Sequence, residues 1–305
     1  MPTGVAGGPA AGRSGPGSVL RSSLPDLLLA AGVMAWIGCV LLVDAIRLPG
    51  AGVPAGAGGP VPPGLGAPPG AAEPVRQVLL GLATWAVLAG LLRRESALVR
   101  TQTLVVVALA TGVEYTFSPL LQAYVYRIGT VPLFVPPGHG LVYLAALALG
   151  RSAVVRSARR PLVTATVVLG GAWGSWGVLG AGRPDHLGAF WFCCLFGFLA
   201  WGPSRTVYVG AFVVVSYLEL TGTALGTWAW ATRDPVLHVV GQGNPPSGAA
   251  GGYGWFDLYA LLLAPRLLTG VRWVRAAVRP RLRPPAAIGP VPDADPQPCL
   301  AEETG

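Results

Sequence analysis

The sequence contains no lysine and few charged residues of any kind, since charged residues make up 11% of its 305 positions. A soluble globular protein carries about 25% charged residues. The shortage of charge therefore argues against a soluble enzyme, a disordered protein and a nucleic-acid-binding module. The four cysteines show no Cys-x-x-Cys spacing, which disfavours a disulfide framework or a zinc ribbon. With 52% hydrophobic residues and a mean hydropathy of +0.58, the composition is typical of a polytopic membrane protein.

The chain contains many long apolar runs. A membrane-spanning helix needs about 20 mostly apolar residues, and this criterion predicts about eight transmembrane helices in an all-α bundle. They run over Pro25–Ile46, Val75–Leu92, Thr101–Leu121, Gly140–Arg151, Leu162–Leu179, Leu187–Trp201, Thr206–Thr227 and Tyr253–Leu268.

The arginines give these spans an orientation. If the spans alternate in direction, every arginine falls on one side except Arg47, Arg76, Arg127, Arg183 and Arg233. Loops rich in basic residues stay on the cytoplasmic side. The pattern predicts a multi-pass protein of the cell membrane with both termini in the cytoplasm.

The remaining segments are rich in Gly and Pro. Residues 1–23 and 277–305 are predicted to be disordered cytoplasmic tails, because they contain too little apolar surface to order themselves. The transmembrane domain covers 24–276, with a flexible outer loop at 49–74. The arginines after the last span are expected to contact membrane lipids, and nothing in them indicates nucleic acid.

Two stretches of the chain resemble each other. Each has an acidic residue deep in a span (Glu114, Glu219), then an aromatic-x-aromatic pair, then a Pro-Pro turn that enters the next span. Two parallel four-helix repeats, related by an axis along the membrane normal, would produce this pattern. Two unrelated outer loops with similar aromatic belts and turns would produce it as well.

Ionisable residues inside a bilayer are costly and therefore indicate function. The candidate catalytic acids are Glu114, Glu219 and Asp257, all of which are expected in the outer half of the membrane and in one pocket. A carboxyl group in an apolar pocket is favoured in its neutral, proton-donating form. The candidate substrate-binding residues at the same level are Tyr124, Tyr126, Arg127, His139, Trp228, Trp230, Asn244 and Tyr253.

Each candidate also has a structural interpretation. Glu114 could be paired with Arg127 or with hydroxyl groups, Asp257 could stabilise a helix N-terminus, and the aromatic residues could form an interfacial belt. No metal site is assigned, because the three histidines show no metal-ligand spacing, although separate loops could still bring them together. Nucleotide and diphosphate motifs are also lacking, and no cofactor is indicated.

The segment 114–137, with Glu114, Tyr124, Tyr126 and the following VPLFVPP, resembles membrane-bound carotenoid 1,2-hydratases of the bacterioruberin type. More distantly, it resembles integral-membrane lycopene cyclases. The resemblance implies an all-helical enzyme that acts on isoprenoid alkenes by acid chemistry without a redox cofactor. The resemblance implies site roles for three residues only, Glu114, Tyr124 and Tyr126.

Together these features favour an integral-membrane lyase or isomerase that protonates a lipid-soluble isoprenoid or carotenoid alkene, leading to hydration or cyclisation. The alternative is a transporter or lipid-binding protein with an outer-facing pocket. A structural role in a membrane complex remains a third hypothesis.

Overall fold

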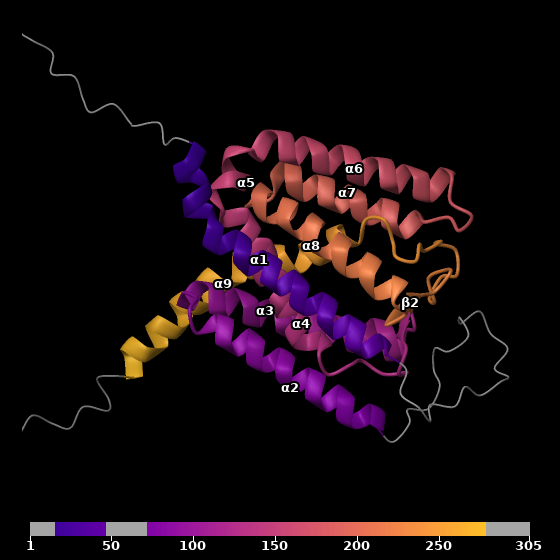
Figure 1. Cartoon of the computed structure of the whole chain (residues 1–305), viewed down its shortest axis with the longest axis horizontal. Helices are drawn as coiled ribbons and strands as arrows, with labels where there is room; N and C mark the ends of the chain where they lie inside the picture. The colour runs from indigo at the N-terminus through magenta and orange to yellow at the C-terminus, as the bar shows by residue number, and fades with distance from the viewer. Residues whose placement is uncertain (1–15, 47–71, 279–305) are drawn as a thin grey trace, which may run out of the picture.

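The computed structural model describes residues 16–46 and 72–278, and in these ranges the chain is all-helical, as predicted (Figure 1). The helices are α1 (Pro16–Ala45), α2 (Ala72–Leu92), α3 (Ala97–Tyr115), α4 (Val135–Arg151), α5 (Ala153–Ser157), α6 (Arg159–Leu179), α7 (His186–Trp201), α8 (Arg205–Ala224) and α9 (Ala249–Val278). A π-helical turn, η1 (Thr116–Leu120), continues α3, and two short strands, β1 (Tyr124–Tyr126) and β2 (Trp228–Trp230), complete the described elements.

Five of these elements are long and apolar enough to cross a membrane: α1, α2, α3 with η1, α6 and α8. Helix α7 is also apolar but has only 16 residues. Helices α4 and α9 cover the two other predicted spans. Helix α1 begins at Pro16 and α2 at Ala72, so helical structure reaches into the predicted tail and the predicted outer loop. The rest of the predicted tails and loop lies outside the described residues.

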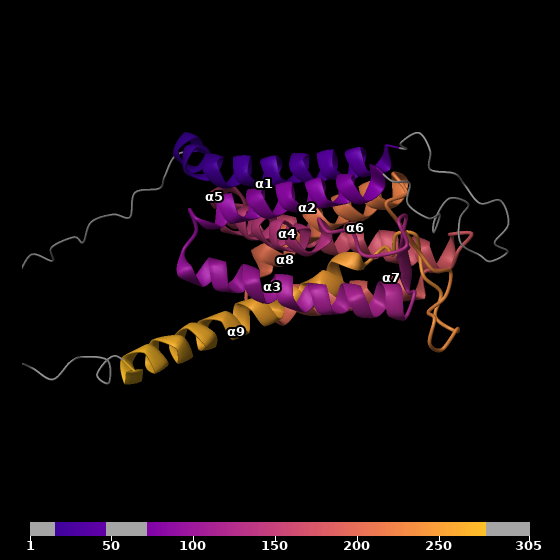
Figure 2. The same cartoon turned by 90° about the horizontal axis from the view of Figure 1, so that it is seen from below.

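The long helices lie side by side, except that the second half of α9 extends away from the bundle, and each runs in the direction opposite to the long helix before it (Figure 2). Both strands lie at one end of the bundle, hereafter the strand end, and α5 lies at the opposite end. The beginning of α1 and the end of α9 are both at the end opposite the strands.

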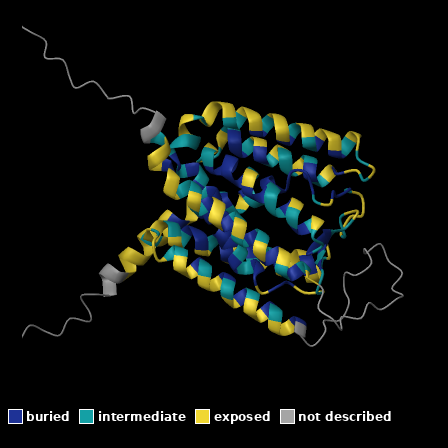
Figure 3. Ribbon diagram, viewed as in Figure 1, coloured by how far each residue is buried: buried dark blue, intermediate teal, exposed yellow. Residues whose placement is uncertain are grey.

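The outer surface of the bundle is apolar. Many large apolar side chains on its outer helices are exposed, among them Leu79, Leu82, Val168, Leu169 and Phe190, each at least 60% exposed. The exposed residues follow the outward faces of the helices (Figure 3). A continuous apolar exterior of this kind is typical of a surface that contacts lipid or another protein.

Helix α4 lies at the centre, where it packs against α8 and α3, and α9 packs against α3 and α8. Most residues of α4 are buried. The contact between α4 and α8 is tight because Gly210 has no side chain: a Cβ there would lie 2.4 Å from the carbonyl oxygen of Ala146. Small residues allow helix backbones to approach closely in membrane proteins.

Candidate functional site

A cavity of about 610 Å³ opens among the described residues at the strand end. Its walls are mainly apolar and aromatic, with contributions from Trp36 of α1, Trp191 of α7 and Phe256 of α9. Glu114, His139 and Glu219 are among its few polar side chains. A concave, mostly apolar site with a few convergent polar groups is the usual form of a small-molecule site.

The first of these polar groups, Glu114, comes from the last turn of α3 and is 5% exposed. Its Oε2 atom accepts hydrogen bonds from Tyr124 Oη at 2.9 Å and from Tyr126 Oη at 2.7 Å. Its Oε1 atom lies 2.8 Å from His139 Nε2 on α4. Three side chains thus hold the Glu114 carboxyl group in one orientation at the cavity wall.

Glu219 of α8 occupies an equivalent position and is 3% exposed. Its Oε2 atom accepts hydrogen bonds from the indole N–H groups of Trp228 and Trp230, both at 3.1 Å. An indole N–H only donates, whereas a tyrosine hydroxyl both donates and accepts. The two carboxyl groups therefore have chemically different surroundings. Glu114 can exchange a proton with its neighbours, whereas Glu219 only accepts hydrogen bonds.

The strands bring the two glutamate clusters together. β1 and β2 pair antiparallel, with Tyr124 opposite Trp230 and Tyr126 opposite Trp228. The rings of Tyr124 and Trp230 have centroids 4.6 Å apart, and those of Tyr126 and Trp228 are 6.1 Å apart. The four rings form one aromatic wall of the cavity.

Similar turns lead into both strands. After α8, Gly226 has a φ of +70°, the amide of Thr227 bonds to Gly222 O and that of Gly226 bonds to Thr223 O. This is a Schellman arrangement, which reverses the chain after a helix. After η1, Gln122 has a φ of 58°, and the amides of Ala123 and Gln122 bond to Phe117 O and Ser118 O.

The first copy of the motif has one more residue than the second. Tyr124 is ten residues after Glu114, but Trp228 is nine after Glu219. The π-helical turn Thr116–Leu120 absorbs this extra residue, since a π-turn is wider than an α-turn by one residue. Despite the different spacing, Tyr124 and Tyr126 therefore both reach Glu114, and Trp228 and Trp230 both reach Glu219.

The phenols of Tyr124 and Tyr126 are strongly perturbed. Burial raises the pKa of both hydroxyls well above the usual value near 10, and the neighbouring Glu114 raises the pKa of each further. Both phenols are therefore protonated at neutral pH and available as hydrogen-bond donors to Glu114.

A second polar pair lies where α4 and α9 enter the bundle. His139 is the fifth residue of α4 and Tyr253 the fifth of α9, and their rings stack with centroids 5.3 Å apart. Both residues line the cavity. His139 thus contacts Glu114 on one side and Tyr253 on the other.

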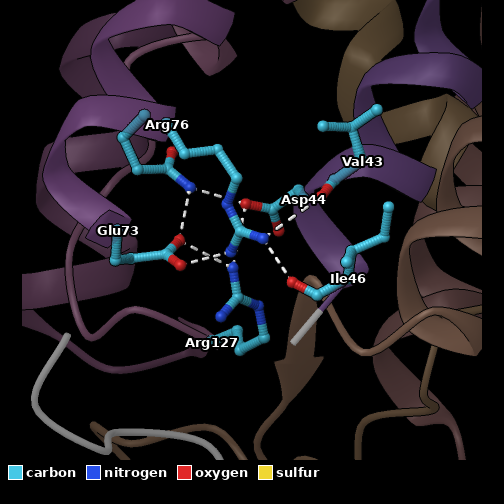
Figure 4. A network of polar contacts seen from close by, with 7 residues as sticks. Val43, Asp44, Ile46, Glu73, Arg76 and Arg127 are labelled. Atoms are coloured by element: carbon cyan, nitrogen blue, oxygen red, sulfur yellow. Dashed lines mark hydrogen bonds and ion pairs between the residues drawn. The ribbon is translucent and has the colours of Figure 1, made fainter. Parts of the chain in front are cut away.

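Arg127 lies outside the cavity. Its guanidinium pairs with Asp44 of α1 at 3.1 Å and with Glu73 of α2 at 2.9 Å, and Arg76 also pairs with Glu73 (Figure 4). Burial opposes the charge of Arg127, but Asp44 and Glu73 outweigh this effect and raise the pKa of its guanidinium. Arg127 ties the end of β1 to α1 and α2, and it does not pair with Glu114.

Asn244 also lies outside the cavity, where it supports β2. Its Oδ1 atom accepts a hydrogen bond from the backbone N–H of Trp230 at 2.9 Å. The loop that carries Asn244 is organised by Asp185, which accepts hydrogen bonds from the amides of Gly188, Gly243 and Ser247.

Asp257 is buried on α9, one turn beyond Tyr253, but it is not among the residues that line the cavity. The expectation that all three acids share one pocket therefore holds for Glu114 and Glu219 only.

The sequence did not predict the contact between His139 and Glu114, or the contributions of Trp36 and Trp191 to the cavity wall. Among the described residues, no three His, Cys, Asp or Glu side chains are grouped so that they could hold a metal ion.

Comparison with known proteins adds no relative: no protein-family model, no curated protein and no solved structure matches the chain. The geometry of the cavity is thus the basis for a functional conclusion.

Proposed function

We propose that this protein is an integral-membrane enzyme that protonates a carbon–carbon double bond of a lipid-soluble isoprenoid, giving hydration or cyclisation. The observation that carries the proposal is the pair of buried carboxyl groups, Glu114 and Glu219, on the wall of one apolar, aromatic cavity. A cavity with such walls suits a hydrocarbon ligand. Its ionisable groups are placed where acid–base chemistry on that ligand is possible.

The hydrogen bonds suggest different roles for the two acids. Glu114 contacts His139 and two tyrosine hydroxyls, so it has partners that can exchange a proton with it. In the proposed reaction the protonated carboxyl group of Glu114 donates its proton to one carbon of the alkene, and the positive charge forms on the other carbon.

The aromatic wall would stabilise that cation, because the face of an indole or phenol ring attracts positive charge. In a cyclisation, a second double bond attacks the cation, and Glu219 removes a proton from the neighbouring carbon. In a hydration, water adds to the cation and Glu219 takes the surplus proton. Either route leaves Glu114 one proton short and Glu219 with one to release.

The proposed substrate class rests on the shape of the site and on the sequence resemblance. The cavity is bounded by large apolar side chains, which suits a long hydrocarbon. The resemblance of segment 114–137 to carotenoid 1,2-hydratases makes an acyclic carotenoid our first choice of substrate.

We further propose that eight helices cross the membrane, namely α1 to α4 and α6 to α9, with both termini in the cytoplasm. The strand end would then face outward. The alternating helix directions and the arginine distribution support this topology. A parallel duplication of a four-helix unit would make α8 the counterpart of α3 and α9 the counterpart of α4. Two observations support it: the glutamate–aromatic clusters are equivalent, and α3 packs against α9 as α8 packs against α4.

Expression in a bacterial host that accumulates lycopene tests the proposal. Mass spectrometry of the lipid extract should show a product that is either 18 mass units heavier than lycopene for each hydration or isomeric with lycopene after cyclisation. The E114Q variant should give no product at equal protein level in the membrane. Bound lycopene that is recovered unchanged from the purified protein would instead favour the lipid-binding or transport alternative.

A further inference from the structure

Four buried polar atoms on the central helices have no hydrogen-bond partner within the described part of the chain. They are His139 Nδ1, Tyr143 Oη, Tyr208 Oη and Asp257 Oδ2. Their residues are at most 6% exposed. Buried polar groups are rarely left unpaired in proteins, and ordered water commonly connects them.

Helix spacing places His139, Tyr143 and Asp257 at successive levels of the bundle. His139 and Tyr143 are four residues apart on α4, and Tyr253 and Asp257 are four apart on α9, so each pair occupies one face of its helix. Both helices run from the strand end towards the opposite end. Because His139 stacks on Tyr253, the next turn of each helix brings Tyr143 and Asp257 to the same level.

Tyr208 extends this series towards the other end of the bundle. It lies in the first turn of α8, which packs against both α4 and α9. The ring of Phe198 on α7 packs against Tyr208, with centroids 5.0 Å apart, and against Trp255 of α9, with centroids 5.2 Å apart. This places Tyr208 near the turn of α9 that includes Asp257. The first turn of α8 belongs to the end opposite the strands.

The series meets the candidate site at His139. The Nε2 atom of its imidazole contacts Glu114 Oε1 at 2.8 Å, and its Nδ1 atom is one of the four unpartnered atoms. An imidazole can take a proton on one nitrogen and release one from the other. His139 is therefore placed to connect the cavity with the polar groups deeper in the bundle.

We propose that Tyr208, Asp257, Tyr143 and His139, bridged by water, form a relay that delivers a proton to Glu114 from the end of the bundle opposite the strands. This inference rests on the proposed function, because a Glu114 that has given its proton to an alkene must regain one. In each transfer, His139 Nδ1 accepts a proton while Nε2 releases one to Glu114. This leaves the imidazole protonated on Nδ1. Before the next transfer the ring must turn, so that an N–H again faces Glu114 and an unprotonated nitrogen faces the relay, and each cycle then delivers one proton to Glu114.

The relay can be tested without a substrate. Infrared bands that are present in the full-length protein but absent from E114Q belong to the Glu114 carboxyl group. After transfer of the protein in lipid nanodiscs from H₂O to D₂O, the shift of these bands reports how fast a proton reaches Glu114. We expect Y143F and D257N to slow this exchange at least tenfold, and D257E to restore it partly.

Y259F is the matched control, because Tyr259 is on the same helix as Asp257 but is 46% exposed. It should exchange at the wild-type rate. Y143F removes only a hydroxyl group, so it keeps the test valid if D257N does not fold. Wild-type exchange rates in folded Y143F, or in folded Y143F and D257N together, would overturn the relay.

The same variants separate the relay from the proposed function. If E114Q abolishes lycopene conversion but Y143F and D257N exchange at the normal rate, the relay is wrong and the proposed function stands. If E114Q still converts lycopene while Y143F slows the exchange, the proposed function is wrong and the proton path to Glu114 stands.

Discussion

Tyr124 lies directly opposite Trp230 in the β1–β2 ladder, and the two rings donate hydrogen bonds to different glutamates. Tyr124 donates to Glu114 of α3, and Trp230 donates to Glu219 of α8. Two strands of three residues each therefore fix the relative position of two carboxyl groups that are 105 residues apart in the sequence.

The tyrosine hydroxyls give a pH prediction. Burial, and secondarily the contact with Glu114, raises the pKa of Tyr124 and Tyr126, so folding favours the protonated phenols. Their contribution to the free energy of unfolding is fully present below about pH 10, the pKa of an unfolded tyrosine, and is lost as the pH rises above it.

We therefore expect Y124F and Y126F to leave the phenolate absorbance of the folded protein unchanged between pH 9 and 11. In denaturant, each variant should lose one titrating group near pH 10. A loss of phenolate absorbance in the folded state would show that these hydroxyls reach solvent.

Gly222 makes room for the Trp228 ring. A Cβ on Gly222 would lie 1.9 Å from a ring atom of Trp228, so G222A must move the indole that donates to Glu219. We expect G222A to lower the midpoint of thermal unfolding and to change the tryptophan fluorescence, at a cost of about 1–3 kcal/mol, as is usual for overpacking.

G112A serves as the control for that substitution. A Cβ on Gly112 of α3 would meet no atom within 4 Å, and alanine is favoured over glycine inside a helix by about 0.5–1 kcal/mol. Equal stability of G222A and G112A would contradict the assigned packing of Trp228.

Arg127 holds together charges from three separate elements. Its loss in R127Q would leave Asp44 and Glu73 side by side with one fewer cation, and both carboxyl groups are buried. Breaking a buried ion pair typically costs about 3–5 kcal/mol, and we expect the lower part of this range because Arg76 still pairs with Glu73.

The midpoint of thermal unfolding at neutral pH, compared with that of the wild type, measures the R127Q defect. R100Q is a suitable control, because the only side-chain hydrogen bond of Arg100 in the described structure goes to a backbone carbonyl, Glu95 O, at an exposed site.

Much of the helical arrangement could be predicted from the sequence, because it depends on apolar runs. The local pairing of Glu114 with Tyr124 and Tyr126, and of Glu219 with Trp228 and Trp230, is also encoded nearby: the acid and its aromatic partners lie within twelve residues. The contact of His139 with Glu114 depends on how α4 packs against α3, and no local pattern indicates it.

Long-range packing also explains the other differences. Arg127 pairs with Asp44 and Glu73, which are 83 and 54 positions away in the sequence. No sequence pattern indicates these two acids, rather than Glu114, as the partners of Arg127. Asp257 was expected beside the two glutamates because it is near the beginning of its helix. One further turn of α9 places it beyond the cavity wall.

The central claim is that Glu114 gives a proton to an alkene carbon. Incubation of the purified protein with lycopene in D₂O, followed by mass spectrometry of the product, tests this claim most directly. We expect one deuterium atom on carbon for each hydration or ring formed, and a loss of product of about 10²-fold or more in E114Q. Product without carbon-bound deuterium, or an E114Q variant as active as the wild type, would contradict the claim.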